Sequence, residues 1–133
     1  MPINVFWDDF EKTIIRAELV DYWTWNDYYR SVAEGARLVQ GMSHRIDQIV
    51  DMRRSHSLPP GVAPTHLKRA RASDPENPGI TVIVGANLIV QVFVAVLERA
   101  YGTRFPPRYI VETLDEAHDL ISESRIESEL STT

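Results

Sequence analysis

The sequence predicts an α/β domain with a mixed sheet of about five strands and four helices. Two apolar runs near its start, Ile3–Trp7 and Thr13–Leu19, are separated by a short polar segment, as in a β-hairpin. Farther along, Ile80–Gly85 is a continuous, mostly β-branched run, which is typical of a strand buried on both faces of a parallel sheet. Strand-like and helix-like segments alternate after the hairpin, and this alternation favours parallel strands with helices packed on them. The predicted order is β-β-α-β-α-β-α-β-α.

The strands differ in how strongly their patterns predict burial. Thr13–Leu19 alternates with a period of two, so one face of this strand is expected to be more buried than the other. Arg45–Met52 is short and contains several aliphatic residues, which favours a buried parallel strand near the middle of the sheet. Arg108–Val111 is predicted as the last strand.

Four helices are predicted from capping residues and from apolar spacing. Thr24 can accept hydrogen bonds from free backbone amides at a helix start, and Thr113-Leu114-Asp115-Glu116 has the sequence of a capping box. Glycine after a periodic segment marks a helix end, and proline suits the first turn of a helix. The predicted helices run from Thr24 to Gly41, from Pro60 to Arg71, from Asn87 to Tyr101 and from Thr113 onward.

Composition restricts the domain organisation and the chemistry. A chain of 133 residues, 44% of them apolar, fits one domain with its own core. We place that domain at residues 1–126 and expect a frayed tail at residues 127–133. The chain has no cysteine, which excludes disulfides, thiol catalysis and thiolate metal sites. Its four histidines form no ligand spacing and it has no nucleotide-binding glycine motif, so we predict no metal and no cofactor.

Hydropathy and charge bear on location and partners. No apolar segment reaches the ~18 residues of a membrane span, and the first residues do not have the pattern of a signal peptide, so we expect a cytoplasmic protein. The net charge of −5 is unevenly distributed. Met52–Arg71 holds five basic residues and no acid, whereas Glu112–Glu129 holds seven acids and one base. Tryptophans and tyrosines near the hairpin have acidic neighbours, which argues against nucleic-acid binding.

Three segments resemble the STAS family (sulfate-transporter and anti-sigma-factor-antagonist domains), especially its SpoIIAA-like branch. Arg45–Arg53 resembles the central strand that ends in an acidic residue before the functional loop. Ile80–Gly85 resembles the strand that follows it, and Tyr109–Ala117 resembles the closing strand and helix. The resemblance covers nearly the whole chain and implies a mixed sheet with a regulatory or binding role.

The sequence departs from this family at the position of its phosphorylated serine. Antagonists of anti-sigma factors carry that serine at the start of the helix after the central strand, where this chain has Pro59-Pro60-Gly61. Ser55 and Ser57 lie a few residues earlier. The departure favours a binding surface that works without the family's phosphorylation switch.

The candidate site lies where parallel strands end, because ligands of open α/β sheets bind beyond the carboxyl ends of the strands. Asp51–Gly61, Gly85-Ala86-Asn87 and Glu112-Thr113 should meet there. Arginine can bind carboxylates or phosphates through two parallel hydrogen bonds, and a helix start favours anions. The candidate partner- or ligand-binding residues are Asp51, Arg53, Arg54, Ser55, His56, Ser57, Gly85 and Asn87, with Ser55 and Ser57 as candidate phosphorylation sites.

Three hypotheses for function follow. The first is a non-enzymatic module that binds a protein partner or a small apolar or anionic ligand at this site. The second is a carrier of a lipid or another apolar ligand, because the Leu88–Tyr101 helix is more apolar than a helix on one sheet face requires. Deep burial would account for that helix first, and a homodimer contact through it next. The third is an enzyme that uses Asp51 and His56 as an acid–base pair.

Overall fold

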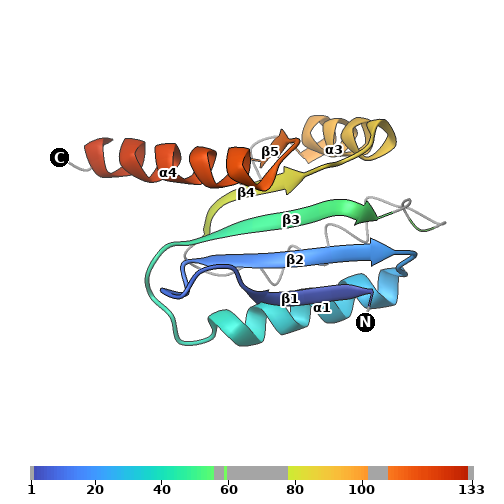
Figure 1. Ribbon diagram of the computed structural model, residues 1–133, viewed down its shortest axis with the longest axis horizontal. Helices are drawn as coiled ribbons and strands as arrows, with labels where there is room; N and C mark the ends of the chain where they lie inside the picture. Colours follow the sequence, from blue (N-terminus) through green and yellow to red (C-terminus); the bar gives the residue numbers. More distant parts are fainter. Residues whose placement is uncertain (1, 56–58, 60–77, 102–107, 132–133) are drawn as a thin grey trace.

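The computed structural model describes residues 2–55, 59, 78–101 and 108–131, and these form one mixed sheet with helices on both faces (Figure 1). The strands lie in chain order across the sheet. β1 and β2 are antiparallel, and every later neighbouring pair is parallel. The strands are β1 (Ile3–Trp7), β2 (Ile14–Asp21), β3 (Ile46–Ser55), β4 (Pro78–Val84) and β5 (Arg108–Val111). The predicted hairpin and five-stranded mixed sheet are therefore confirmed.

Three of the four predicted helices lie in the described residues: α1 (Trp25–Val39), α3 (Leu88–Tyr101) and α4 (Leu114–Ser131). The helix predicted over 60–71 falls outside them. α1 begins with the predicted cap, since the Thr24 hydroxyl accepts from the Asp27 amide at 3.1 Å and the Asp27 carboxylate accepts from the Thr24 amide at 2.8 Å. α4 continues to Ser131, so residues 127–131 of the expected frayed tail are helical.

β3 is longer than the sequence predicted, and the difference affects the candidate site. Arg53, Arg54 and Ser55 were expected in the loop after the strand, but they are its last three residues. β2 extends to Asp21 and pairs with β3 as far as Ser55. Because backbone hydrogen bonding to a neighbour can hold polar residues in a strand, the side-chain pattern alone ended the strand too early.

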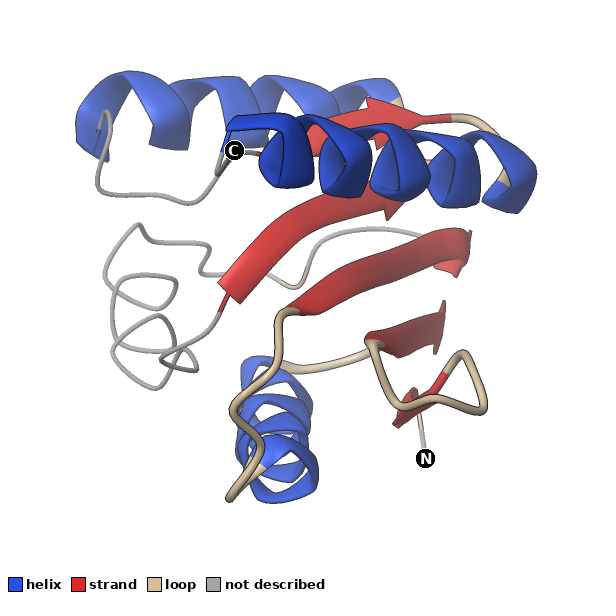
Figure 2. Cartoon of the chain, turned by 90° about the vertical axis from the view of Figure 1, so that its left-hand side faces the viewer, coloured by secondary structure: helices blue, strands red, loops and turns tan. Residues whose placement is uncertain are grey.

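Two apolar clusters hold the helices to opposite faces of the sheet. α1 and α4 lie on different sides (Figure 2). On one face, Leu19 and Met52 of the sheet pack with Val90 of α3 and with the aromatic residues at the start of α1. On the other face, Ile49 and Val82 pack with Ala117 and Ile121 of α4. The Trp23 ring lies edge-on to Trp25, with centroids 5.5 Å apart.

A buried carboxylate fixes α4 to the sheet at the amino ends of β3 and β4. Asp47 accepts hydrogen bonds from Arg45 at 2.9 and 3.0 Å, from Arg125 of α4 at 2.8 Å and from the Ile80 amide at 2.8 Å. Gly79 is required beside it, because a Cβ there would lie 1.9 Å from an Asp47 oxygen. This end of the sheet is therefore held together by ionic contacts inside the fold.

Candidate functional site

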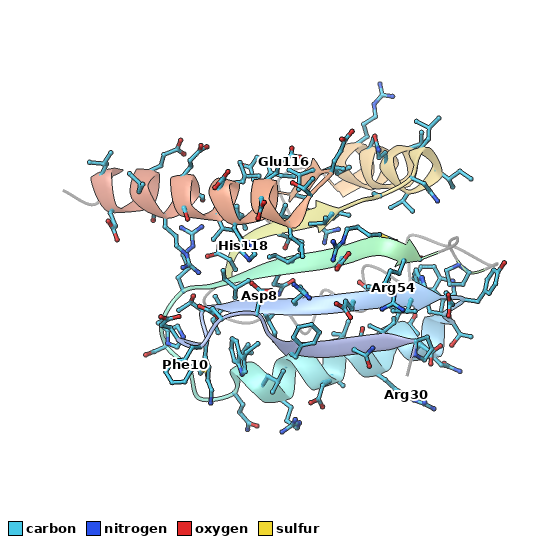
Figure 3. All side chains as sticks on the ribbon, viewed as in Figure 1. Asp8, Phe10, Arg30, Arg54, Glu116 and His118 are labelled. Carbon is cyan, nitrogen blue, oxygen red and sulfur yellow. The ribbon has the colours of Figure 1, made fainter. Side chains whose placement is uncertain are left out.

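The carboxyl ends of β3, β4 and β5 meet as the sequence predicted. Asp51 pairs with Val84, Val84 pairs with Val111, and the Gly85 amide donates to the Val111 carbonyl at 2.9 Å. Figure 3 shows Arg54 where β2 and β3 end, and Glu116 on the first turn of α4. We call this edge the carboxyl-end rim; it comprises Arg53, Arg54, Gly85–Val92 and Glu112–Glu116. His56 and Ser57 of the predicted site lie outside the described residues.

Asp51 and Arg53 form a two-bond ion pair on the same strand. Arg53 donates from Nε to Oδ1 at 2.9 Å and from Nη2 to Oδ2 at 2.8 Å, and its amide donates to Oδ1 at 3.1 Å. Asp51 is only 2% exposed, whereas Arg53 reaches solvent. Burial by itself raises the pKa of Asp51, but the hydrogen bonds and charge of Arg53 outweigh it and hold this pKa below its ordinary value. Asp51 is thus an ionised structural partner of Arg53.

This ion pair predicts a defined pH dependence. Because the folded pKa of Asp51 is lowered, its ionised form stabilises the fold above the unfolded pKa, and this stabilisation is lost as pH falls through the folded pKa. Asp51→Asn should lower the free energy of unfolding at pH 7 by about 1.5–3 kcal/mol, the range for hydrogen bonds to a charged group. Urea unfolding of wild type and variant should show the difference shrinking below about pH 4. A difference that grows on acidification would contradict this account.

Gly85 and Asn87 make the turn from β4 into α3. Gly85 has φ +70°, and a Cβ there would lie 2.5 Å from Cγ of Arg53. The Asn87 side chain accepts from the Val90 amide at 3.0 Å and so caps α3. Both residues therefore shape the rim: Gly85 lets β4 approach Arg53 closely, and Asn87 sets where the helix begins.

Ser55 is engaged inside the fold. Its hydroxyl accepts a hydrogen bond from Nε1 of buried Trp23 at 2.9 Å. A phosphate on Ser55 would disturb this contact. Phosphorylation of Ser55 or Ser57 stays a prediction.

An apolar stripe on α3 faces solvent and begins at the carboxyl-end rim. Leu88, Ile89 and Val92 are 73%, 67% and 56% exposed, and Ala95 is also exposed one turn later. Val90 between them is buried in the core. The excess apolar surface predicted for this helix is thus at least partly on the outside of the protein. Aliphatic side chains grouped in this way are typical of contact surfaces.

Sequence reasoning missed two charged clusters. Besides Asp47, it missed Asp8, which accepts from Arg16 at 2.9 Å and lies 2.6 Å from Nε2 of His118, 110 residues away in the chain (Figure 3). An aspartate within the apolar strand of residues 45–52 was a signal for a buried ion pair, because carboxylates are rarely buried without partners. No comparable signal linked Asp8 to His118, since their contact depends on how α4 crosses the sheet.

The described part of the chain contains neither a metal-binding group nor a membrane-spanning helix. Its histidines and acids form no group of three that could hold a metal ion. None of its helices combines the length and the apolar character that crossing a membrane requires.

Comparisons with known proteins bear on the fold. Neither a protein-family model nor a curated protein sequence matches the chain. A solved structure does: an uncharacterised protein of the DUF3478 family from Shewanella loihica PV-4, with a SpoIIAA-like fold, superposes with a TM-score of 0.61 at 16% identity. The match covers 90% of this chain and 91% of that one. The chain therefore has a SpoIIAA-like fold, as the resemblance in its sequence implied.

Proposed function

We propose that this SpoIIAA-like domain is a non-enzymatic binding module whose protein partner docks on the carboxyl-end rim. The observation that carries the proposal is the exposed stripe of Leu88, Ile89 and Val92 at the start of α3. α3 begins three residues after Gly85, the glycine that lies against Arg53 at the same rim. Apolar side chains bordered by arginine are typical of the centre of protein–protein contacts. We expect the module to act in the cytoplasm.

The shape of the stripe favours a protein over a small apolar ligand. A pocket for a lipid is concave and buries the side chains that line it. Leu88, Ile89 and Val92 instead project from the outer surface of a helix and are more than half exposed. A second macromolecular surface can cover them all at once.

The charges favour a partner with an acidic region. Arg54 is exposed, and no acidic side chain in the described residues pairs with it. Arg53 keeps an exposed part although Asp51 holds its guanidinium. Among the described residues, Arg54 pairs with no carboxylate and Arg53 is already held by Asp51. Two such arginines bind a free anion weakly but suit an acidic protein surface.

The environment of Asp51 argues against the enzymatic hypothesis. A general base needs an accessible carboxylate with a pKa near the working pH. Asp51 is buried, accepts hydrogen bonds on both oxygens and has a lowered pKa. Its geometry supports a structural role.

The proposal is tested in cells that express the wild type and a rim variant with different affinity tags. Each is purified through its own tag, and the proteins that co-purify with it are quantified. Leu88→Asp with Ile89→Asp should lose at least about 90% of the accompanying protein, since tenfold weaker binding corresponds to about 1.4 kcal/mol. The matched control is Ile126→Asp with Leu130→Asp, which changes two exposed apolar residues near the far end of α4. A rim variant that keeps every partner of the wild type would refute the proposal.

A further inference from the structure

The carboxyl-end rim carries basic, apolar and acidic surface in that order. The order follows from the sheet, in which β3, β4 and β5 are neighbours. Exposed Arg53 and Arg54 end β3, the exposed stripe of α3 follows β4, and exposed Glu112 and Asp115 follow β5. The apolar surface therefore lies between opposite charges.

We propose that the partner at this rim is a second copy of the chain, related by a two-fold axis through the α3 stripe. This inference rests on the proposed function of the rim. A two-fold contact uses the same patch on both copies, so each end of the patch meets the opposite end of its partner. Here the axis places Arg54 of each copy against Glu112 and Asp115 of the other.

The net charge of the chain opposes self-association, so the complementary charges act only locally, at the rim. Each copy has a net charge of −5, so two copies repel one another at long range. A surface that brings a cation onto acids offsets this repulsion at the contact. Arg54, Glu112 and Asp115 are all exposed, and none of them forms an ion pair within the described residues. The contact thus forms new ion pairs without breaking any ion pair among the described residues.

The stripe gives the two-fold contact an apolar centre. Leu88 and Val92 lie one helical turn apart and Ala95 about one turn farther, so they form a line along the exposed side of α3. Two such helices related by a two-fold axis cross with their apolar lines in contact. Solvent exclusion at this centre strengthens the flanking ion pairs.

Charge reversal distinguishes this arrangement from a general loss of folding. Arg54→Glu alone places acid against acid at both ends of the contact, and the double variant Glu112→Arg, Asp115→Arg alone places base against base. In an equal mixture of the two variants, the mixed dimer again has opposite charges at both ends. We expect each variant alone to dimerise at least about tenfold more weakly than wild type, and the mixture to regain most of the lost affinity.

The measurement is sedimentation velocity over a dilution series of the full chain, with native mass spectrometry to identify the mixed dimer. Arg30→Glu is the control and should dimerise like wild type, because exposed Arg30 lies on α1, below β1 in Figure 3, whereas α3 lies above β4. A wild type that stays monomeric, or a mixture that regains no affinity, would overturn the two-fold contact. If the wild type is monomeric and the Leu88→Asp, Ile89→Asp variant still loses a different protein, the proposed function stands and this inference fails.

Discussion

Replacing Asp47 by alanine should lower the free energy of unfolding by about 3–5 kcal/mol, the range for breaking a buried ion pair from one side. Asp47 is fully buried and compensates two arginines, one before β3 and one on α4. Without it, Arg45 and Arg125 repel one another, and the Ile80 amide loses its acceptor. The loss should be the largest of any single acidic residue in the described part of the chain.

Urea unfolding of wild type and Asp47→Ala at neutral pH measures this loss. Asp119→Ala is the matched control, because Asp119 is also an aspartate but is exposed on α4. It should change stability by less than about 0.5 kcal/mol, as surface substitutions usually do. If Asp47→Ala were equally mild, the ionic contact between α4 and the sheet would not stabilise the fold.

Gly85→Ala should destabilise the protein by about 2–5 kcal/mol, the sum of left-handed backbone strain and overpacking. Gly85 has φ +70°, and an added Cβ would lie 2.5 Å from Cγ and 3.1 Å from Cα of Arg53. Because the clash involves backbone as well as side chain, Arg53 can relieve it only by shifting β3 or leaving Asp51. The variant should therefore also weaken the Asp51–Arg53 ion pair.

Gly41→Ala separates the two causes. Gly41 has φ +81°, but nothing lies within 4 Å of an added Cβ there. It should therefore show the backbone strain alone, about 1–2 kcal/mol. Thermal and urea unfolding of the two variants should place Gly85→Ala clearly below Gly41→Ala. Equal losses would mean that the close approach of β4 to Arg53 has no energetic consequence.

The fold was predictable because its local signals agree with one another. The Ile80–Gly85 run predicted a buried strand, and the Thr24 cap predicted the start of a helix. Strand ends were less predictable, as β3 shows: Arg53–Ser55 belong to the strand because β2 pairs with them, and no local pattern encodes a neighbour.

The candidate site was predictable in place but not in detail. The convergence of residues 51–55, 85–87 and 112–113 follows from parallel strands, whose carboxyl ends share one edge. The role of each residue could not be predicted from parallel strands alone. In the structure Asp51 binds Arg53, Ser55 accepts from Trp23 and Asn87 caps α3. The apolar character of α3 could be read from its residues. Which of them are buried depends on tertiary packing, which buries Val90 and leaves Leu88 and Ile89 exposed.

Exposed apolar residues occur at the rim and elsewhere, so a comparison between two of them tests where a partner binds. Phe10, at the hairpin tip, is 98% exposed and lies at the opposite end of the molecule from the rim (Figure 3). The most direct test places a photo-crosslinking phenylalanine analogue at Ile89 in one strain and at Phe10 in another. We predict a crosslinked protein from position 89, a second copy of the chain, and none from position 10. Crosslinks from position 10 alone would contradict it.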